Sequence, residues 1–202
     1  MAYTTIDDPS AYFQTTIYTG TGSSHAITNG GNSNLQPDFV WIKGRSGDGD
    51  DSTEHALTDS VRGVTKELST NDIGAVETVA QGLTAFGSNG FTVGTDASYN
   101  TSSATYVSWN WKASGSTSTN SDGDIDGTQT VDQTAGFSVT TYSGNGGSNQ
   151  RLGHGLGVTP KIYILKRRDN NGQWVFVNTL IDGTLDYLFL ETTGAKSNSG
   201  RT

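Results

Sequence analysis

The chain has 202 residues, a formal net charge of −8, 27 glycines, 3 prolines and no cysteine. This length accommodates one large β domain or two small ones with a substantial core. The acidic balance argues against a nucleic-acid partner and against docking on an anionic membrane, and the lack of cysteine excludes disulfides and thiolate metal sites. The sequence has no apolar run of about 18 residues and no signal-peptide pattern in residues 1–10, so we expect no membrane insertion.

Short runs rich in Thr, Val, Tyr and Trp, separated by Gly, Asn, Asp and Ser, predict an all-β protein. Residues 1–11 are predicted to form a polar N-terminal arm. The first strand is expected at residues 13–19, before a Gly-x-Gly turn, and a similar strand is expected at residues 137–143 before a second such turn. Phe137 and Tyr142 lie 124 positions after Phe13 and Tyr18, which indicates an internal repeat.

The clearest element of this repeat is an apolar strand that follows a proline and ends in Lys-x-Arg. It occurs at residues 38–45 and again at residues 161–168. Offsets that stay constant through a strand and both its ends predict two copies of one unit, with length changes confined to loops. The offset is 123 for Pro160, Lys166 and Arg168 relative to Pro37, Lys43 and Arg45, and it is 120 for Gly183, Leu188 and Ala195 relative to Gly63, Leu68 and Ala75.

Three further strands are predicted in the first copy without counterparts in the second, at residues 83–86, 90–94 and 106–112. In the last of these, Val107, Trp109 and Trp111 lie on one face of the strand, and smaller or more polar residues lie on the other. Two tryptophans on one face form a large apolar surface, so we interpret this face as part of the core.

The predicted fold is therefore all-β, with two tandem antiparallel β-sandwiches of jelly-roll-like or immunoglobulin-like topology. The first sandwich is assigned to residues 12–113, a Ser/Thr/Gly-rich linker to residues 114–134, and the second sandwich, which lacks its last strands, to residues 135–202. An incomplete sandwich exposes apolar faces and unpaired strand edges. Either the natural chain continues past Thr202 or another subunit supplies the missing strands, and both alternatives predict an elongated or assembled object.

One stretch has the spacing of a metal-binding loop. Asp122, Asp124 and Asp126 alternate before Gly127, and oxygen ligands at alternate positions suit Ca²⁺. The twelfth position of such a loop is normally a glutamate, whereas this chain has Gln133. The competing interpretation is an acidic turn between the two sandwiches. We expect no other cofactor.

No catalytic pattern is recognisable around His25, His55 or His154, and we predict that the protein is not an enzyme. Aromatic side chains in loops can stack on sugar rings, which makes Tyr99 and Trp174 candidate glycan contacts, although Trp174 can equally cap the core. The two Lys-x-Arg ends are interpreted either as contacts for an acidic partner or as plain solvated strand ends.

The order of these motifs resembles a known family. "AYTTIDDPSAYFQTTIYTG", "LQPDFVWIKGRS", "DSVRGVTK", "GFTVG" and "YVSWNWKA" are similar to a repeated domain in structural proteins of tailed phages that infect marine and aquatic bacteria. "AGFSVTTYSGNG" and "GHGLGVTPKIYILKRRD" resemble its second unit. The resemblance implies a virion-associated, tail-fibre-like or adhesin-like protein and brings no catalytic residues. Related proteins tend to run through further units, whereas this chain stops within one.

These observations lead us to expect a structural subunit of a virion or other extracellular assembly. Its expected partners are further copies of itself, other virion proteins and a host-surface glycan. Two alternatives stay open, namely a carbohydrate-binding adhesion module and a cellular filament whose subunits exchange strands.

Overall fold

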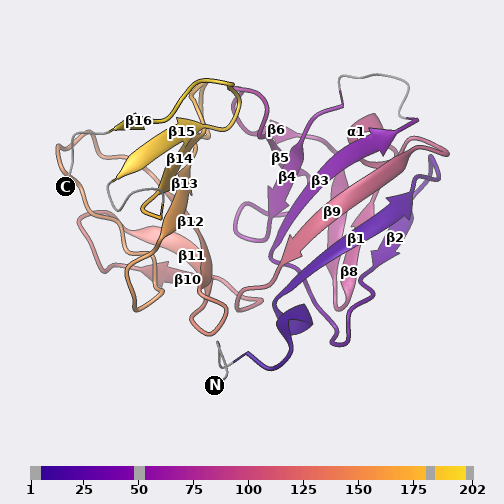
Figure 1. Cartoon of the computed structure of the whole chain (residues 1–202), viewed down its shortest axis with the longest axis horizontal. Helices are drawn as coiled ribbons and strands as arrows, with labels where there is room; N and C mark the ends of the chain where they lie inside the picture. Colours follow the sequence, from indigo (N-terminus) through magenta and orange to yellow (C-terminus); the bar gives the residue numbers. More distant parts are fainter. Residues whose placement is uncertain (1–5, 48–52, 181–184, 199–202) are drawn as a thin grey trace.

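The computed structural model describes residues 6–47, 53–180 and 185–198, and its regular elements are nearly all strands (Figure 1). Residues 1–5 of the predicted arm lie outside the described residues, and Asp8 caps the 3-10 helix η1 (Pro9–Ala11) by accepting a hydrogen bond from the Ser10 backbone N–H. A one-turn helix, α1, spans Ala97–Asn100. The strands are β1 Phe13–Thr19, β2 His25–Thr28, β3 Phe39–Ser46, β4 Ala56–Asp59, β5 Lys66–Ser69, β6 Glu77–Thr78, β7 Leu83–Gly87, β8 Gly90–Val93, β9 Thr105–Trp111, β10 Ser118–Asn120, β11 Gly127–Asp132, β12 Phe137–Tyr142, β13 Ile162–Leu165, β14 Val175–Asn178, β15 Asp186–Phe189 and β16 Ser197–Asn198.

The first half of the chain forms an antiparallel β-sandwich, which confirms the predicted all-β sandwich class. One sheet has six strands in the order β1-β9-β3-β4-β5-β6, and the other has three in the order β2-β8-β7. The strand β9 lies between β1 and β3 and pairs with both along its whole length. Both partners precede β9 in the sequence by roughly 60 to 90 residues, so β9 makes long-range pairings on both of its edges.

The main core lies between these two sheets. Tyr18 and Tyr106 stack with ring centroids 5.2 Å apart, and the Tyr18 hydroxyl donates a hydrogen bond of 2.8 Å to the carbonyl oxygen of Tyr99. At the hairpin between β7 and β8, Gly90 has a φ of +124°, and a Cβ there would lie 2.0 Å from the carbonyl oxygen of Ile27, so only glycine fits. The other buried residues of this core are Val40, Ile42, Ala56, Leu83, Phe91, Val93 and Ala104.

The prediction that Trp109 and Trp111 point into this core is wrong. Along β9 the buried positions are Tyr106, Ser108 and Asn110, and the two tryptophans lie half-buried on the opposite face of the sheet. The Asn110 side-chain amide donates to the carbonyl oxygen of Gln14 and to the Ser108 hydroxyl. Polar groups that are hydrogen-bonded in this way can be buried, so the more apolar face of the strand was not the inner one.

The second half contains two smaller sheets, with strand orders β10-β11-β12 and β13-β14-β15-β16. Strands β10 and β11 fall within residues 114–134, the stretch predicted as a linker. The pairing of the larger sheet repeats the pairing of β3 to β6 residue by residue. Ile162 faces Asn178 as Phe39 faces Asp59, Phe176 faces Leu188 as Leu57 faces Leu68, and Tyr187 faces Ser197 as Glu67 faces Glu77.

The two halves meet through the outer face of the six-stranded sheet. Trp174, which precedes β14, packs with Leu57 and Leu68 of the first half and is buried. Phe137 of β12 stacks on Trp111 with ring centroids 6.1 Å apart. The tryptophan-rich face is therefore partly covered by the second half of the chain. Across the described residues, no helix has the length and apolar character needed to cross a bilayer.

Candidate functional site

The most informative feature for function is a strand position that is filled in the first half and open in the second. In the six-stranded sheet, β9 separates β1 from β3. The sequence counterparts of β1 and β3 are β12 and β13, and within the described residues no strand lies between them. Strand β12 pairs only with β11, and β13 pairs only with β14. Each of the two strands therefore has one unpaired edge within the described residues. We call the position next to these two edges, which corresponds to that of β9 in the first sheet, the open strand position.

The side chains at the open strand position are much more exposed than their counterparts in the first half. Tyr142 is 40% exposed, whereas its counterpart Tyr18 is 8% exposed. Leu165 is 40% exposed, whereas its counterpart Ile42 is fully buried. Ile162 and Ile164 of β13 are also exposed. Large apolar side chains along an edge strand are a typical site of association with another chain.

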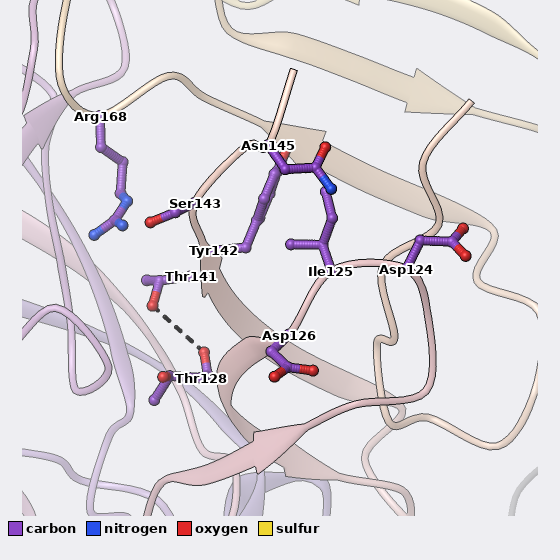
Figure 2. A pocket seen from close by; sticks show the side chains of 9 residues that line it. All are labelled: Asp124, Ile125, Asp126, Thr128, Thr141, Tyr142, Ser143, Asn145 and Arg168. Carbon is purple, nitrogen blue, oxygen red and sulfur yellow. Dashed lines mark hydrogen bonds between the residues drawn. The ribbon is translucent and has the colours of Figure 1, made fainter. Parts of the chain in front are cut away.

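A cleft of about 500 Å³ lies at one end of this position (Figure 2). It is bounded by Thr141, Tyr142 and Ser143 at the end of β12 and by Arg168 just beyond β13. In Figure 2 the Arg168 side chain lies across an unfilled space from these residues. In the first sheet, the corresponding space between the ends of β1 and β3 is filled by Thr105 of β9.

The acidic loop borders the same cleft, but its carboxylates do not gather. The Asp124 carboxylate accepts hydrogen bonds from the backbone N–H and the Nε of Arg151, at 3.0 and 3.2 Å, and this lowers the pKa of Asp124. Figure 2 shows Asp124 and Asp126 on different sides of the loop. The Asp122 backbone N–H donates to Asn120. In residues 6–47, 53–180 and 185–198, no group of three or more His, Asp or Glu side chains is placed to hold a metal ion, so we do not propose a Ca²⁺ site here.

The two aromatic side chains predicted as glycan contacts are both buried, so that prediction is wrong. Tyr99 is 1% exposed, because α1 turns it into the main core. Its hydroxyl donates a hydrogen bond of 2.7 Å to the carboxylate of Glu67. Trp174 is 4% exposed and packs against the first half of the chain. Neither ring is available to stack on a sugar.

Glu67 is a buried carboxylate that sequence reasoning missed. It is largely removed from solvent beside Tyr99, and this burial raises its pKa above the ordinary value of 4.5. Hydrogen bonds donated by the hydroxyls of Tyr99 and Ser69 oppose that shift. No sequence pattern distinguishes Glu67, because its burial depends on α1, which arrives from some thirty residues further along the chain.

This raised pKa predicts a pH dependence of stability. A carboxyl group whose pKa is higher in the folded state stabilises the fold fully below the unfolded-state pKa, and this contribution is lost as the pH rises through the folded-state pKa. The nearly isosteric Glu67→Gln variant cannot ionise, so its free energy of unfolding should increase relative to wild type as the pH rises from about 4.5 towards 8. Urea denaturation at a series of pH values measures this difference. Asp7→Asn, at an exposed position, is the control, and parallel profiles for Glu67→Gln and wild type would contradict the prediction.

Lys166, interpreted from sequence as part of a solvated strand end or partner contact, instead fastens the two halves together. Its ammonium group donates to the carbonyl oxygens of Ile73, Gly74 and Gly172 at 2.6–2.8 Å. It also lies 5.9 Å from the centroid of the Trp174 ring. Partial burial lowers the pKa of Lys166. The three carbonyl groups occupy the three hydrogen-bond donors of the ammonium group.

Its counterpart Lys43 is also engaged within the chain. The Lys43 ammonium group donates to the backbone carbonyl and the hydroxyl of Thr53, at 2.6 and 3.1 Å. The two lysines thus have equivalent sequence positions and different partners. Sequence analysis identified the pair as repeated, but four of the five acceptors are backbone carbonyl groups, which no side-chain pattern in the sequence reveals.

Comparison with known proteins gives a family and no neighbour of known activity. Neither the search of curated proteins nor the search of solved structures returned a match. A family described as a domain of unknown function, DUF7483, matches residues 8–202, which is nearly the whole chain. The protein with the open strand position between β12 and β13 is thus a member of the DUF7483 family.

Proposed function

We propose that the protein is a structural subunit of an extracellular or virion assembly, in which neighbouring chains meet at exposed strand edges. The observation that carries this proposal is the open edge of β13, where Ile162, Ile164 and Leu165 are exposed, whereas the counterpart strand β3 is paired on both sides. Unpaired backbone groups and apolar side chains on one edge favour pairing with another chain. The virion setting rests on the sequence resemblance to structural proteins of tailed phages.

The contact between the two halves of the chain supports assembly into a ring or an open filament. Trp174 of the second half donates to the carbonyl oxygens of Ser69, at the end of β5, and Asp72, and Lys166 donates to that of Gly74. Asp72 and Gly74 lie in the connection between β5 and β6. The two surfaces are different, so the contact is heterologous rather than self-complementary. Heterologous contacts repeated between identical units produce rings or open filaments. The same geometry applied from chain to chain would therefore produce a ring or an open filament.

Self-association of the purified chain tests the proposal. The chain has a mass of 21.3 kDa, and size-exclusion chromatography with light scattering should give a larger mass that increases with protein concentration. The Leu165→Lys variant, which places a charge at the open edge of β13, should associate less than wild type. Val64→Lys is the matched control, since Val64 is exposed to nearly the same degree, 39% against 40%, and lies between β4 and β5 in the first half. A mass of 21.3 kDa at every concentration would overturn the proposal.

A further inference from the structure

We propose that the open strand position binds an extended strand of the β9 type, donated by another polypeptide and inserted antiparallel to both β12 and β13. This inference names the kind of partner and rests on the proposed function for its biological setting. Its structural basis is independent, because it follows from the pairing of the first sheet and the matching registers of the second.

The register of the first sheet specifies how such a strand would lie. Tyr106 faces Tyr18 of β1, and Ser108 faces Ile42 of β3. Transferred to the second half, these positions place a tyrosine of the incoming strand opposite Tyr142 and a small residue opposite Leu165. In the first half the tyrosine pair stacks at 5.2 Å. The incoming strand would therefore cover two side chains that are now exposed.

The outer face of the position also fits aromatic residues of the β9 type. Trp109 and Trp111 of β9 face Trp41 and Phe39 of β3, with ring centroids 5.9 and 5.3 Å apart in the two pairs. The counterparts of Trp41 and Phe39 are Ile164 and Ile162, both exposed. These sites are apolar and lack the large partners that fill the first sheet.

If one copy of the chain donated its β9 to another copy, the number of open strand positions would not fall. Each copy has two positions of this kind, one between β1 and β3 and one between β12 and β13, and its described residues contain one β9. A copy that donated its β9 would open its own first sheet. The strand must therefore come from a polypeptide segment in addition to β9, and its chemistry is an alternation of aromatic or β-branched residues with small polar ones. Such strand addition gains main-chain hydrogen bonds from the edge and specificity from alternate side chains.

The experiment uses the 202-residue chain and a labelled synthetic peptide with the sequence of residues 105–112, TYVSWNWK. Fluorescence anisotropy should show saturable binding of one peptide per chain, and a scrambled peptide of the same composition should bind at least about tenfold more weakly, since only the register distinguishes the two. Hydrogen exchange should show new protection of the backbone amides of residues 137–142 and 162–165. Leu165→Lys should weaken binding about tenfold or more, because the peptide would have to bury the new charge, and Val64→Lys should not.

The outcomes separate this inference from the proposed function. No saturable binding, equal binding of the scrambled peptide, or protection confined to β1 and β3 would overturn the inference. Protection at β1 and β3 would mean that the peptide replaces the chain's own β9. A chain that self-associates but does not bind the peptide retains the proposed function and loses the inference. A chain that stays monomeric yet binds the peptide at β12 and β13 retains the inference alone, and the exchange measurement on wild type gives this result even if Leu165→Lys does not fold.

Discussion

Replacing Arg62 with alanine is expected to lower the free energy of unfolding by about 3–5 kcal/mol, because it leaves a buried carboxylate without its partner. The Arg62 Nε donates to the Asp59 carboxylate at 2.5 Å, and both side chains are 4% exposed. The remaining guanidinium nitrogens donate to the carbonyl oxygens of Lys66 and Leu57, each at 3.0 Å. Urea denaturation monitored by tryptophan fluorescence measures the loss.

Two further variants separate the charge of Arg62 from its geometry. Arg62→Lys keeps the positive charge but cannot form the planar fork that reaches Asp59, Leu57 and Lys66 together, so it should recover only part of the lost stability. Arg167→Ala removes the exposed ion pair with Asp169 and should leave the denaturation midpoint unchanged. A midpoint for Arg62→Ala equal to that of Arg167→Ala would show that the buried pair makes no net contribution.

The elements that the sequence predicted well are those in which local pattern and pairing agree. The offset of 123 between the two proline-strand-lysine blocks predicted that β3 and β13 are equivalent, and the structure gives them equivalent partners in β4 and β14. The alternation of side chains over residues 106–112 also predicts a strand, and the structure confirms it as β9. The repeat is detectable because strands and turns preserve spacing, whereas length changes are tolerated in loops.

The assignment of faces failed because a sheet in the middle of a protein has two covered sides. Asn110 and Ser108 face the sandwich interior, where the Asn110 NH2 group donates to the carbonyl oxygen of Gln14 and to the Ser108 hydroxyl. Trp109 and Trp111 face outward, towards the second half of the chain. Hydrophobicity alone ranks the tryptophan face as the inner one. The inner face of β9 can be identified only when the hydrogen-bond partners of Asn110 and Ser108 and the covering of the outer face by the second half are known. Both depend on residues far from β9 in the sequence.

The sequence predicts that the second half lacks strands, but it does not predict where in the sheet the open strand position lies. Residues 135–202 contain no counterparts of the predicted strands at 83–86, 90–94 and 106–112. The sequence does not show that the last of these strands, β9, lies between β1 and β3 in the sheet. That order places the open edge beside Tyr142 and Leu165 rather than at the outer rim. Strand order depends on long-range pairing, which has no signature within any one strand.

Replacing Trp174 with alanine is expected to lower the free energy of unfolding by about 3–5 kcal/mol and to loosen the contact between the two halves. The indole ring fills a site bounded by Leu57 and Leu68, and its N–H is shared between the carbonyl oxygens of Ser69 and Asp72, at 2.9 and 3.1 Å. Denaturation should then show two separate transitions instead of one, because the second half would no longer share a buried cluster with the first.

The Trp174→Phe variant separates the ring from its hydrogen bonds. Phenylalanine retains most of the buried apolar surface and loses the N–H, so the cost should be about 1–3 kcal/mol, with the two carbonyl oxygens left to find other donors. Trp109→Ala, at a half-buried position on the outer face of the six-stranded sheet, should cost less than Trp174→Ala and preserve a single transition. If Trp174→Ala unfolded in one transition at the wild-type midpoint, the cluster around Trp174 would not couple the halves. The contact between the two halves would then give no support to the proposed assembly.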